Sequence, residues 1–497
     1  MADKTEIGIL AYGAYLPRLR LARKVAADAN AWFNPALKGL ARGERTMCNW
    51  DEDTVTMAVE AARDCLIGQD RGTVSSLSLA STSFPFEDRL NAGIVLEALN
   101  LAPSVNAQDL TASQRAATSG LITAVQMARG GAGPVLMVAS EKRRTKTASP
   151  RELETGDGAA ALLIGTGPVV ARLIGHASRT VDFVDHFRGE GFEFDYTWEE
   201  RWIRDEGYNK IVPAALADVF KATAVKPADV AHFAMPCVLP RVAAGIAKKA
   251  GMAESAVRDN LHAVCGETGA AHPIVMLVDA LEKAKPGDKI LVVGFGQGCD
   301  ALLFEATDAL PRLAPRLGIM GHLARRKEET NYARFLAFND LVAIERGLRA
   351  DIDKQTPLSS LYRNRRMLTG LIGGQCRKCG TLQFPKSNVC VNPNCNAFHS
   401  QDDHAFADTP AKVQSFTADR LTYSPDPPHY YGMVVFDEGG RMMIDFTDCD
   451  AASVDVDAPM RMMFRIKEYD PARGFTRYFW KAAPTQPNAG GPAPAKA

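Results

Sequence analysis

Four cysteines in the last third of the chain have the spacing of a metal site. Cys376 and Cys379 form a CxxC pair, and after ten further residues Cys390 and Cys395 form a CxxxxC pair. A glycine and a proline supply the tight turns that aim two pairs of thiolates at one tetrahedral ion. Four sulfur ligands leave no open coordination position, so we predict a structural zinc. His399 is the alternative ligand if Cys395 turns away, and four unpaired structural cysteines are the remaining alternative.

A second place where chemistry is expected is the turn after residues 107–112. The composition of residues 107–125 is typical of a strand that turns tightly into a helix of small residues, with Ser113 and Gln114 at its N-terminus. The dipole and free N–H groups of a helix N-terminus stabilise an anion. Together with the loop that contains Gly296 and Gly298, these N–H groups would form an oxyanion hole. A side-chain amide cannot form an acyl-enzyme, so chemistry at Gln114 is expected to be noncovalent.

Candidate acids and bases occur in two further segments. Glu267 lies in the glycine-rich turn 266–269, where it is either a general base or the partner of an arginine. His272 begins the following helix and is either a second base or a packed core histidine. Residues 185–208 place aromatic rings between charged side chains. They form either an insertion at a dimer interface or a wall for a bulky acyl group, with His186 or Tyr208 as proton donor.

Two other features allow more than one interpretation. Cys237 is either a displaced nucleophile or an inert buried thiol. Two basic clusters are alternative candidates for the phosphate-binding part of a coenzyme A groove between the first domain and the C-terminal module, or they are solvated surface. These clusters comprise Arg325, Arg326 and Lys327, and Arg363, Arg365 and Arg366.

The elements that must position these residues belong to several domains. Between residues 7 and 307, short apolar runs alternate with amphipathic helical stretches, which predicts α/β layers. Residues 156–163 and 296–303 are similar in composition, so we expect two related halves, at 1–167 and 168–307. A basic helical connector follows at 308–372. We then expect a zinc ribbon at 373–403, an all-β OB-fold barrel at 404–482 and a disordered tail at 483–497.

Composition limits the classes of function. The 497 residues are 46% hydrophobic and carry no formal net charge. This gives no electrostatic reason to expect a nucleic acid or an anionic membrane as a partner. We find no apolar run of membrane-spanning length and no signal-peptide pattern, and six of the ten cysteines are scattered singly. These observations favour reduced thiols and a cytoplasmic location.

The motifs together resemble a known family. Residues 12–17, 109–120, 156–161, 266–271 and 294–298 resemble the thiolase superfamily, in the branch of 3-hydroxy-3-methylglutaryl-CoA (HMG-CoA) synthase and ketoacyl synthase III. The C-terminal part resembles the DUF35 type of zinc ribbon and OB-fold module. The resemblance implies a duplicated five-layer fold followed by a rubredoxin-like zinc ribbon and a small OB-fold barrel. It also implies an acyl-CoA thioester as substrate and a homodimer.

The same resemblance places substitutions at the family's catalytic positions. The family cysteine falls on Gln114 and the family asparagine on Glu267, while the segment 233–237, where the histidine is expected, contains none. His232 lies close by, but strand alternation points it to the other face. Near residues 81–83, where the synthase has a glutamate, no carboxylate occurs before Glu87.

An enzyme that stabilises a thioester enolate but lacks an acyl-accepting cysteine has few reactions open to it. We expect hydrolytic retro-Claisen cleavage of a β-ketoacyl-CoA, which would release a carboxylic acid and acetyl-CoA. The alternatives are a synthase-like acyltransferase, a retro-aldolase, and a CoA-binding subunit without catalysis.

Overall fold

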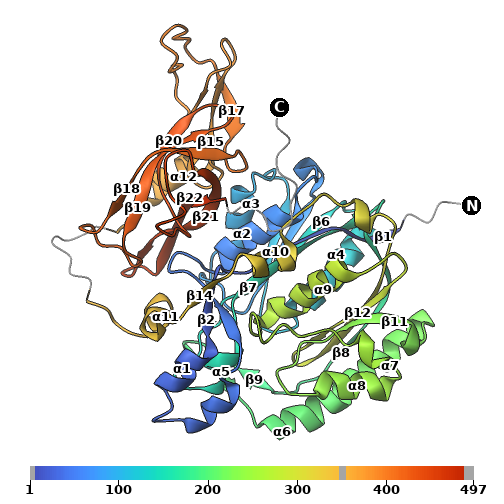
Figure 1. Ribbon diagram of the computed structural model, residues 1–497. Coiled ribbons are helices and arrows are strands. Elements are labelled where there is room, and N and C mark those ends of the chain that lie inside the picture. The colour runs from blue at the N-terminus through green and yellow to red at the C-terminus, as the bar shows by residue number, and fades with distance from the viewer. Residues whose placement is uncertain (1–5, 346–353, 486–497) are drawn as a thin grey trace, which may run out of the picture.

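The computed structural model describes residues 6–345 and 354–485, and its largest part is one mixed nine-stranded sheet built from two halves (Figure 1). The first half has the strand order β5-β4-β6-β7-β1. Its strands are β1 (Ile7–Tyr15), β4 (Ser76–Ala80), β5 (Asn106–Leu110), β6 (Val135–Glu141) and β7 (Gly158–Thr166). Nearly continuous burial explains why β1, β4, β6 and β7 read as apolar runs without alternation, whereas the edge strand β5 is polar and partly exposed.

The second half repeats this arrangement in the order β11-β12-β13-β8. Its strands are β8 (Ala171–Thr180), β11 (Val230–Ala234), β12 (Lys289–Phe295) and β13 (Gly298–Ala306). A single parallel bridge between Phe233 and Val257 stands where the first half has the parallel pair β4 and β5. The halves join where β1 pairs with β8, at Gly8 and Arg172. The two similar segments identified in the sequence lie in β7 and β13, the corresponding strands of the two halves.

Helices complete a five-layer structure, as predicted. Helices α4 (Ala116–Arg129) and α9 (His272–Lys283) pack against strands of both halves and share one buried cluster with them, so they form the central layer. The outer layers are α2 (Thr54–Cys65) and α3 (Asn91–Ala98) on the first half, and α7 (Asn209–Thr223) and α8 (Val242–Ala250) on the second. Shorter helices lie at the periphery: α1 (Arg23–Ala29), α5 (Pro150–Glu154) and α6 (Glu200–Trp202).

The connector is docked on the first domain and is not purely helical. Helix α10 (Gly318–Ala324) packs on β1 and α9, and β14 (Lys327–Glu329) extends a small sheet with β2 (Leu19–Ala22) and β3 (Glu44–Met47). Three short helices follow: α11 (Tyr332–Phe338), α12 (Leu358–Arg363) and α13 (Arg365–Leu368). The strand at 327–329 was not expected from the sequence, because three residues are too short for a recognisable alternation.

The C-terminal module has the zinc ribbon and the OB-fold that the sequence predicted. The ribbon contains β15 (Ile372–Cys376), β16 (Leu382–Gln383) and β17 (Gln401–Ala405). The barrel has the order β20-β19-β18-β21-β22, formed by β18 (Ala411–Asp419), β19 (His429–Phe436), β20 (Arg441–Asp445), β21 (Pro459–Asp470) and β22 (Phe475–Pro484). The expected tail boundary at Ala483 was wrong, because Ala483 and Pro484 pair with Arg461 and Met460 inside the sheet. The remainder of the expected tail, residues 486–497, lies outside the described residues.

A buried polar network joins the barrel to the first half of the sheet. Arg465 of β21 contacts Glu52 at 3.0 Å, and Lys481 of β22 contacts Asp51 at 2.8 Å. The Tyr478 hydroxyl donates to Asp53, the N-cap of α2, at 2.6 Å. Breaking one partner of such a buried pair leaves an uncompensated charge, so this network fixes how the barrel is seated. Among the described residues, no helix is long and apolar enough to cross a membrane.

Candidate functional site

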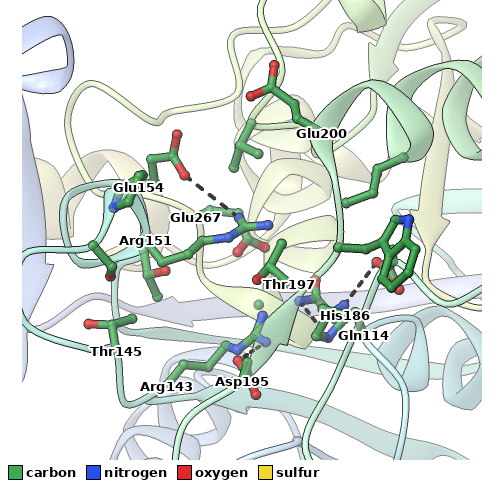
Figure 2. A pocket seen from close by; sticks show the side chains of 18 of the residues that line it. Gln114, Arg143, Thr145, Arg151, Glu154, His186, Asp195, Thr197, Glu200 and Glu267 are labelled. Carbon is green, nitrogen blue, oxygen red and sulfur yellow. Dashed lines mark hydrogen bonds and ion pairs between the residues drawn. The ribbon is translucent and has the colours of Figure 1, made fainter. Parts of the chain in front are cut away.

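A cavity of about 420 Å³ opens where the elbow before α4 meets the second half of the sheet. Figure 2 shows Gln114, His186 and Glu267 directed toward the same space, with Arg143 and Arg151 beside them. Five residues singled out in the sequence line this cavity, although they come from segments up to 153 residues apart: Gln114, His186, Tyr208, Cys237 and Glu267.

The elbow that carries Gln114 is anchored by one buried carboxylate. Asp300 of β13 accepts hydrogen bonds from Arg115 at 2.8 Å, from Thr118 at 2.9 Å and from Ser119 at 2.7 Å. Strand β5 ends at Leu110 and α4 begins at Ala116, so Gln114 lies just before the first helical turn. The predicted strand, turn and helix are therefore present, and the anchored turn presents the Gln114 amide to the cavity.

His186 is held in one orientation by an adjacent carboxylate. Its Nδ1–H donates to Asp185 at 3.0 Å, which leaves Nε2 as an acceptor for the Gln114 amide at 3.3 Å (Figure 2). Gln297 donates to the other oxygen of Asp185 at 2.8 Å. Burial opposes ionisation of Asp185, but the hydrogen bonds that it accepts from the His186 ring and backbone outweigh burial and lower the pKa of that carboxyl. The series of hydrogen bonds from Gln297 through Asp185 and His186 to Gln114 thus fixes both the His186 ring and the Gln114 amide.

Glu267 is positioned by its backbone. Its N–H donates to the Glu154 carbonyl at 2.8 Å, and its carbonyl accepts from Gly156 N–H at 2.8 Å. Gly266 has a φ of +81°, and a side chain there would meet the backbone of Gly156 at 2.9 Å, so the turn requires glycine. The Glu267 side chain is 6% exposed and contributes to the raised pKa of Arg143, although burial opposes that shift. Arg143 itself forms its ion pair with Asp195.

His272 is a structural residue, and its proposed role as a base was wrong. It is 0% exposed, its Nδ1 accepts from Thr268 N–H at 3.0 Å, and its Nε2 bonds the Asn260 carbonyl at 2.8 Å. Both ring nitrogens are therefore occupied, and burial lowers the pKa of His272. Because Thr268 follows Glu267, His272 stabilises the turn that carries the carboxylate.

Tyr208 and Cys237 form a protonated pair in the cavity wall. The Tyr208 ring stacks on Phe295 with centroids 4.2 Å apart, and its hydroxyl hydrogen-bonds the Cys237 thiol. Burial raises the pKa of Cys237 to about 12 and that of Tyr208 well above its usual value. A thiol in this state is a poor nucleophile, which favours the interpretation of Cys237 as inert.

The aromatic segment 185–208 forms one wall of the cavity. Strands β9 (His186–Phe187) and β10 (Tyr196–Thr197) pair as a small ribbon, followed by a π-helical turn over Ile203–Tyr208. Phe194, Tyr196 and Trp198 line the cavity from this ribbon. Because the same rings are partly exposed, a contact with a second copy of the chain remains the alternative prediction.

The predicted oxyanion donors lie elsewhere. Ser113, Gly296 and Gly298 do not line this cavity in the described structure. The Gly296 N–H donates to the Gly298 carbonyl at 3.1 Å, and the Gly296 carbonyl accepts from the Ser113 hydroxyl at 3.0 Å. A side chain at position 296 would meet the Gln114 backbone at 3.2 Å. Gly296 therefore packs the loop on the elbow and its N–H is already bonded, while Gly298 packs against β8; an oxyanion role for these residues stays a prediction.

The predicted coenzyme A clusters do not form one groove. Arg326 pairs with Glu44, Lys327 with Asp450, Arg365 with Glu97 and Arg366 with Asp403, while Arg363 is exposed at the end of α12. None of these residues lines the cavity that contains Gln114 and Glu267, but Arg325 lines a second cavity between the first domain and the barrel, which is where the groove was predicted. Basic residues that are neighbours in sequence do not share one binding site here, because their side chains point to different faces of the domain. The basic residues at the catalytic cavity are Arg143, Arg144, Lys146 and Arg151.

The four cysteines of the ribbon converge as predicted. The sulfur atoms of Cys376, Cys379, Cys390 and Cys395 all lie within 4.8 Å of one another. His399 is not part of this group, so the alternative ligand is not needed among the described residues. The all-cysteine set fits a structural zinc, because four thiolates complete a tetrahedral shell.

Several site residues were missed in the sequence. Asp185 was recoverable, because a carboxylate beside a histidine is a common orienting partner. Arg143 and Arg151 gave no signal, since their positions depend on how the end of β6 and α5 fold over the cavity. Glu141 was also missed: this fully buried carboxylate accepts from Thr82 N–H and Ala270 N–H, so it reaches residues 81–83 from another strand. His232 points away from the cavity and pairs with Asp288 at 3.2 Å.

Comparison with known proteins agrees with this architecture. Residues 220–304 match the C-terminal region of 3-oxoacyl-[acyl-carrier-protein] synthase III. Residues 370–398 match the ChsH2 rubredoxin-like zinc ribbon domain, and residues 406–465 match the ChsH2 C-terminal OB-fold domain.

Full-length relatives match the first two thirds of the chain. Hydroxymethylglutaryl-CoA synthase of Aeropyrum pernix is 28% identical over 335 residues, which is 66% of this chain and 93% of that enzyme. A structure of MvaS in complex with 3-hydroxy-3-methylglutaryl coenzyme A has a TM-score of 0.58 at 20% identity, covering 67% of this chain and 92% of that one. For 3-oxoacyl-(acyl carrier protein) synthase III of Pseudomonas aeruginosa the TM-score is 0.54 at 19% identity, covering 61% of this chain and 98% of that one.

The protein therefore has a thiolase-like domain that is similar to HMG-CoA synthase and to ketoacyl synthase III, followed by a zinc ribbon and an OB-fold domain that match those of ChsH2.

Proposed function

We propose that this protein is an acyl-CoA-processing enzyme that cleaves a β-ketoacyl-CoA by a hydrolytic retro-Claisen reaction. One observation carries the proposal: a buried carboxylate, Glu267, and an oriented side-chain amide, Gln114, line the same cavity, and the only cysteine that lines it in the described structure is protonated. A base with an amide donor suits attack by water, whereas a ping-pong condensation requires a nucleophilic thiolate.

In the proposed reaction Glu267 takes a proton from water, and the hydroxide adds to the β-ketone. The bond between the α and β carbons then breaks, which releases a carboxylic acid and the enolate of acetyl-CoA. The Glu267 carboxyl returns its proton to the α carbon, so one water is consumed and the carboxylate is regenerated. The Gln114 amide, held by His186 and Asp185, donates its second N–H to the thioester oxygen as negative charge develops there.

The cavity also supports a proposal about the substrate. Its volume of about 420 Å³ and its wall of Phe194, Tyr196 and Trp198 favour a bulky or aromatic acyl group. Related structures are described in complex with CoA and with 3-hydroxy-3-methylglutaryl coenzyme A. We propose that Arg144, Lys146 and Arg151 interact with the phosphates of the CoA moiety, because they line the same cavity.

The test is incubation of the pure protein with a panel of β-ketoacyl-CoAs in ¹⁸O-labelled water. Hydrolytic cleavage predicts one ¹⁸O atom in the released carboxylic acid and none in acetyl-CoA, read by mass spectrometry. Release of an unlabelled aldehyde or ketone from a β-hydroxyacyl-CoA would instead identify a retro-aldolase. A lengthened acyl product would identify an acyltransferase, and binding without any product would identify a non-catalytic subunit; each of these three results overturns the proposal.

A further inference from the structure

A second cavity, of about 880 Å³, lies where the OB-fold barrel meets the thiolase-like domain. We call it the interdomain cavity. It is lined by β1, by the end of α2, by residues 310–325 of the connector and by β21 and β22. It shares no lining residue with the catalytic cavity. Its volume is within the range of small-molecule sites.

Two arginines in this cavity form no direct ion pair within the part of the chain that the structure describes, and one of them, Arg325, lies over the Tyr15 ring at 5.2 Å from its centroid. Arg325 follows α10 and Arg461 lies in β21, and neither forms an ion pair with a carboxylate in residues 6–345 and 354–485. The Nη2 atom of Arg325 is buried without any hydrogen-bond partner, while its Nε contacts Nδ1 of His322 at 3.1 Å. Burial and the neighbouring arginines hold the pKa of His322 well below its usual value, so that ring is neutral.

The two guanidinium groups also repel each other. Burial and the charge of Arg325 lower the pKa of Arg461 to about 10, with Glu60 acting in the opposite direction. Guanidinium groups are charged at neutral pH, so two positive charges line this cavity, and burial partly desolvates the one on Arg461. Such an arrangement costs folding free energy, and that cost is removed when an anion binds between the charges.

The described acidic residues around the cavity form no direct ion pair with these two arginines, because each is bonded to another group. Asp448 acts on both from a distance: burial opposes ionisation of this carboxyl, but the charges of Arg465, Arg325, Arg18 and Arg461 lower its pKa. Glu60 accepts both from Arg63 at 3.0 Å and from the N–H of Phe464 at 2.9 Å. The other four carboxylates bond backbone N–H groups or different arginines: Asp64 and Glu282 accept backbone N–H groups, Asp408 pairs with Arg63 and Arg71, and Asp448 pairs with Arg465.

We propose that the interdomain cavity is a binding site for a small phosphorylated anion, held between Arg325 and Arg461. A guanidinium group binds phosphate through two parallel hydrogen bonds, and Arg325 and Arg461 both line this cavity. A phosphate monoester carries a charge of about −1.5 to −2 at neutral pH, which matches two guanidinium groups, whereas one carboxylate matches only one. Arg316 cannot serve in the same way, because it donates to the backbone carbonyls of Tyr12 and Cys65.

The test uses the full-length protein and inorganic pyrophosphate as the probe. Binding is measured by calorimetric titration and by thermal unfolding, both at constant ionic strength. The wild type is expected to bind pyrophosphate, and Arg325→Gln and Arg461→Gln are each expected to weaken binding at least about tenfold, the effect of losing one charge-assisted contact. Arg326→Gln is the matched control. It removes a neighbouring arginine that pairs with Glu44 outside the cavity, so its affinity for pyrophosphate should equal that of the wild type.

Unfolding without the probe separates loss of a site from loss of the fold. Because each substitution at Arg325 or Arg461 removes mutual repulsion, the Tm of both variants without anion should equal or exceed that of the wild type. Competition by CoA would identify the substrate's own phosphates as one source of the anion, whereas pyrophosphate binding that CoA does not affect would identify a separate phosphorylated metabolite. Absence of pyrophosphate binding at millimolar concentration, or equal binding by wild type and both variants, would overturn the proposal.

Discussion

Replacement of Glu267 by glutamine is the most direct test of the proposed chemistry. The turn that carries this residue is held through backbone hydrogen bonds to Glu154 and Gly156 and through His272, so an isosteric side chain should leave the fold intact. Glutamine cannot take a proton from water. Loss of a general base lowers turnover by roughly two to four orders of magnitude, equivalent to about 3 to 5 kcal/mol of transition-state stabilisation.

The assay is cleavage of the best β-ketoacyl-CoA of the panel, with kcat and KM measured separately and folding checked by circular dichroism and thermal unfolding. We expect a large fall in kcat and a change in KM of less than about threefold, because the carboxylate acts on water and not on the bound thioester.

Glu154→Gln is the matched control. Glu154 lines the same cavity, and its side chain lies 3.9 Å from Arg151, but its contribution to the turn comes from its backbone carbonyl. This variant should therefore retain kcat within a few-fold of the wild type. Near-normal turnover by Glu267→Gln would show that the carboxylate is structural and would refute the assignment of a base. Equal losses in the two variants would instead indicate a general electrostatic effect of the cavity.

Three further predictions concern the metal, the thiol and pH. Cys379→Ser should reduce bound zinc, measured by elemental analysis, and destabilise the C-terminal module, because a structural site contributes its metal-binding free energy to folding; full zinc content in this variant would contradict the ligand set. Cys237→Ser should keep turnover within about tenfold of the wild type, since the Cys237 thiol is protonated and is a poor nucleophile. For the same reason, intact-mass spectra of the wild type during turnover should show no acyl adduct on Cys237. A stable adduct would favour the synthase-like alternative. Burial raises the pKa of Glu282 to about 7, so its contribution to stability is present below about pH 4.5 and is lost as pH rises toward 7. Between pH 5 and pH 8 in urea unfolding, the free energy of unfolding of the wild type should therefore fall by on the order of 1 kcal/mol more than that of Glu282→Gln, allowing for partial solvent screening. Parallel pH profiles of the two proteins would contradict this shift.

Much of the architecture followed from local patterns. The strands at 135–141 and 158–166 are buried on both faces, so they appear as continuous apolar runs, and the barrel strands show their alternation directly. The strand at 171–180 was missed because it mixes charged residues with small ones and pairs with strands far away in the sequence. The strand at 475–484 was also missed, although its aromatic residues alternate and it pairs with the strand just before it. The four zinc ligands were predictable because their geometry is set by two short turns.

The candidate site shows where local information ends. The sequence determined that Gln114 occupies a helix N-terminus, that Glu267 occupies a glycine-rich turn and that Cys376, Cys379, Cys390 and Cys395 form a zinc site, because each depends on fewer than about twenty consecutive residues. Only the tertiary structure decided that His186 reaches Gln114, that His272 is fully hydrogen-bonded, and that Arg325 lines one cavity with Arg461 of the barrel, apart from Arg326 and Lys327. The physical reason is that side chains distant in sequence meet through the packing of whole layers and domains, whose relative placement is fixed by buried contacts such as Asp300 with Arg115 and Arg465 with Glu52.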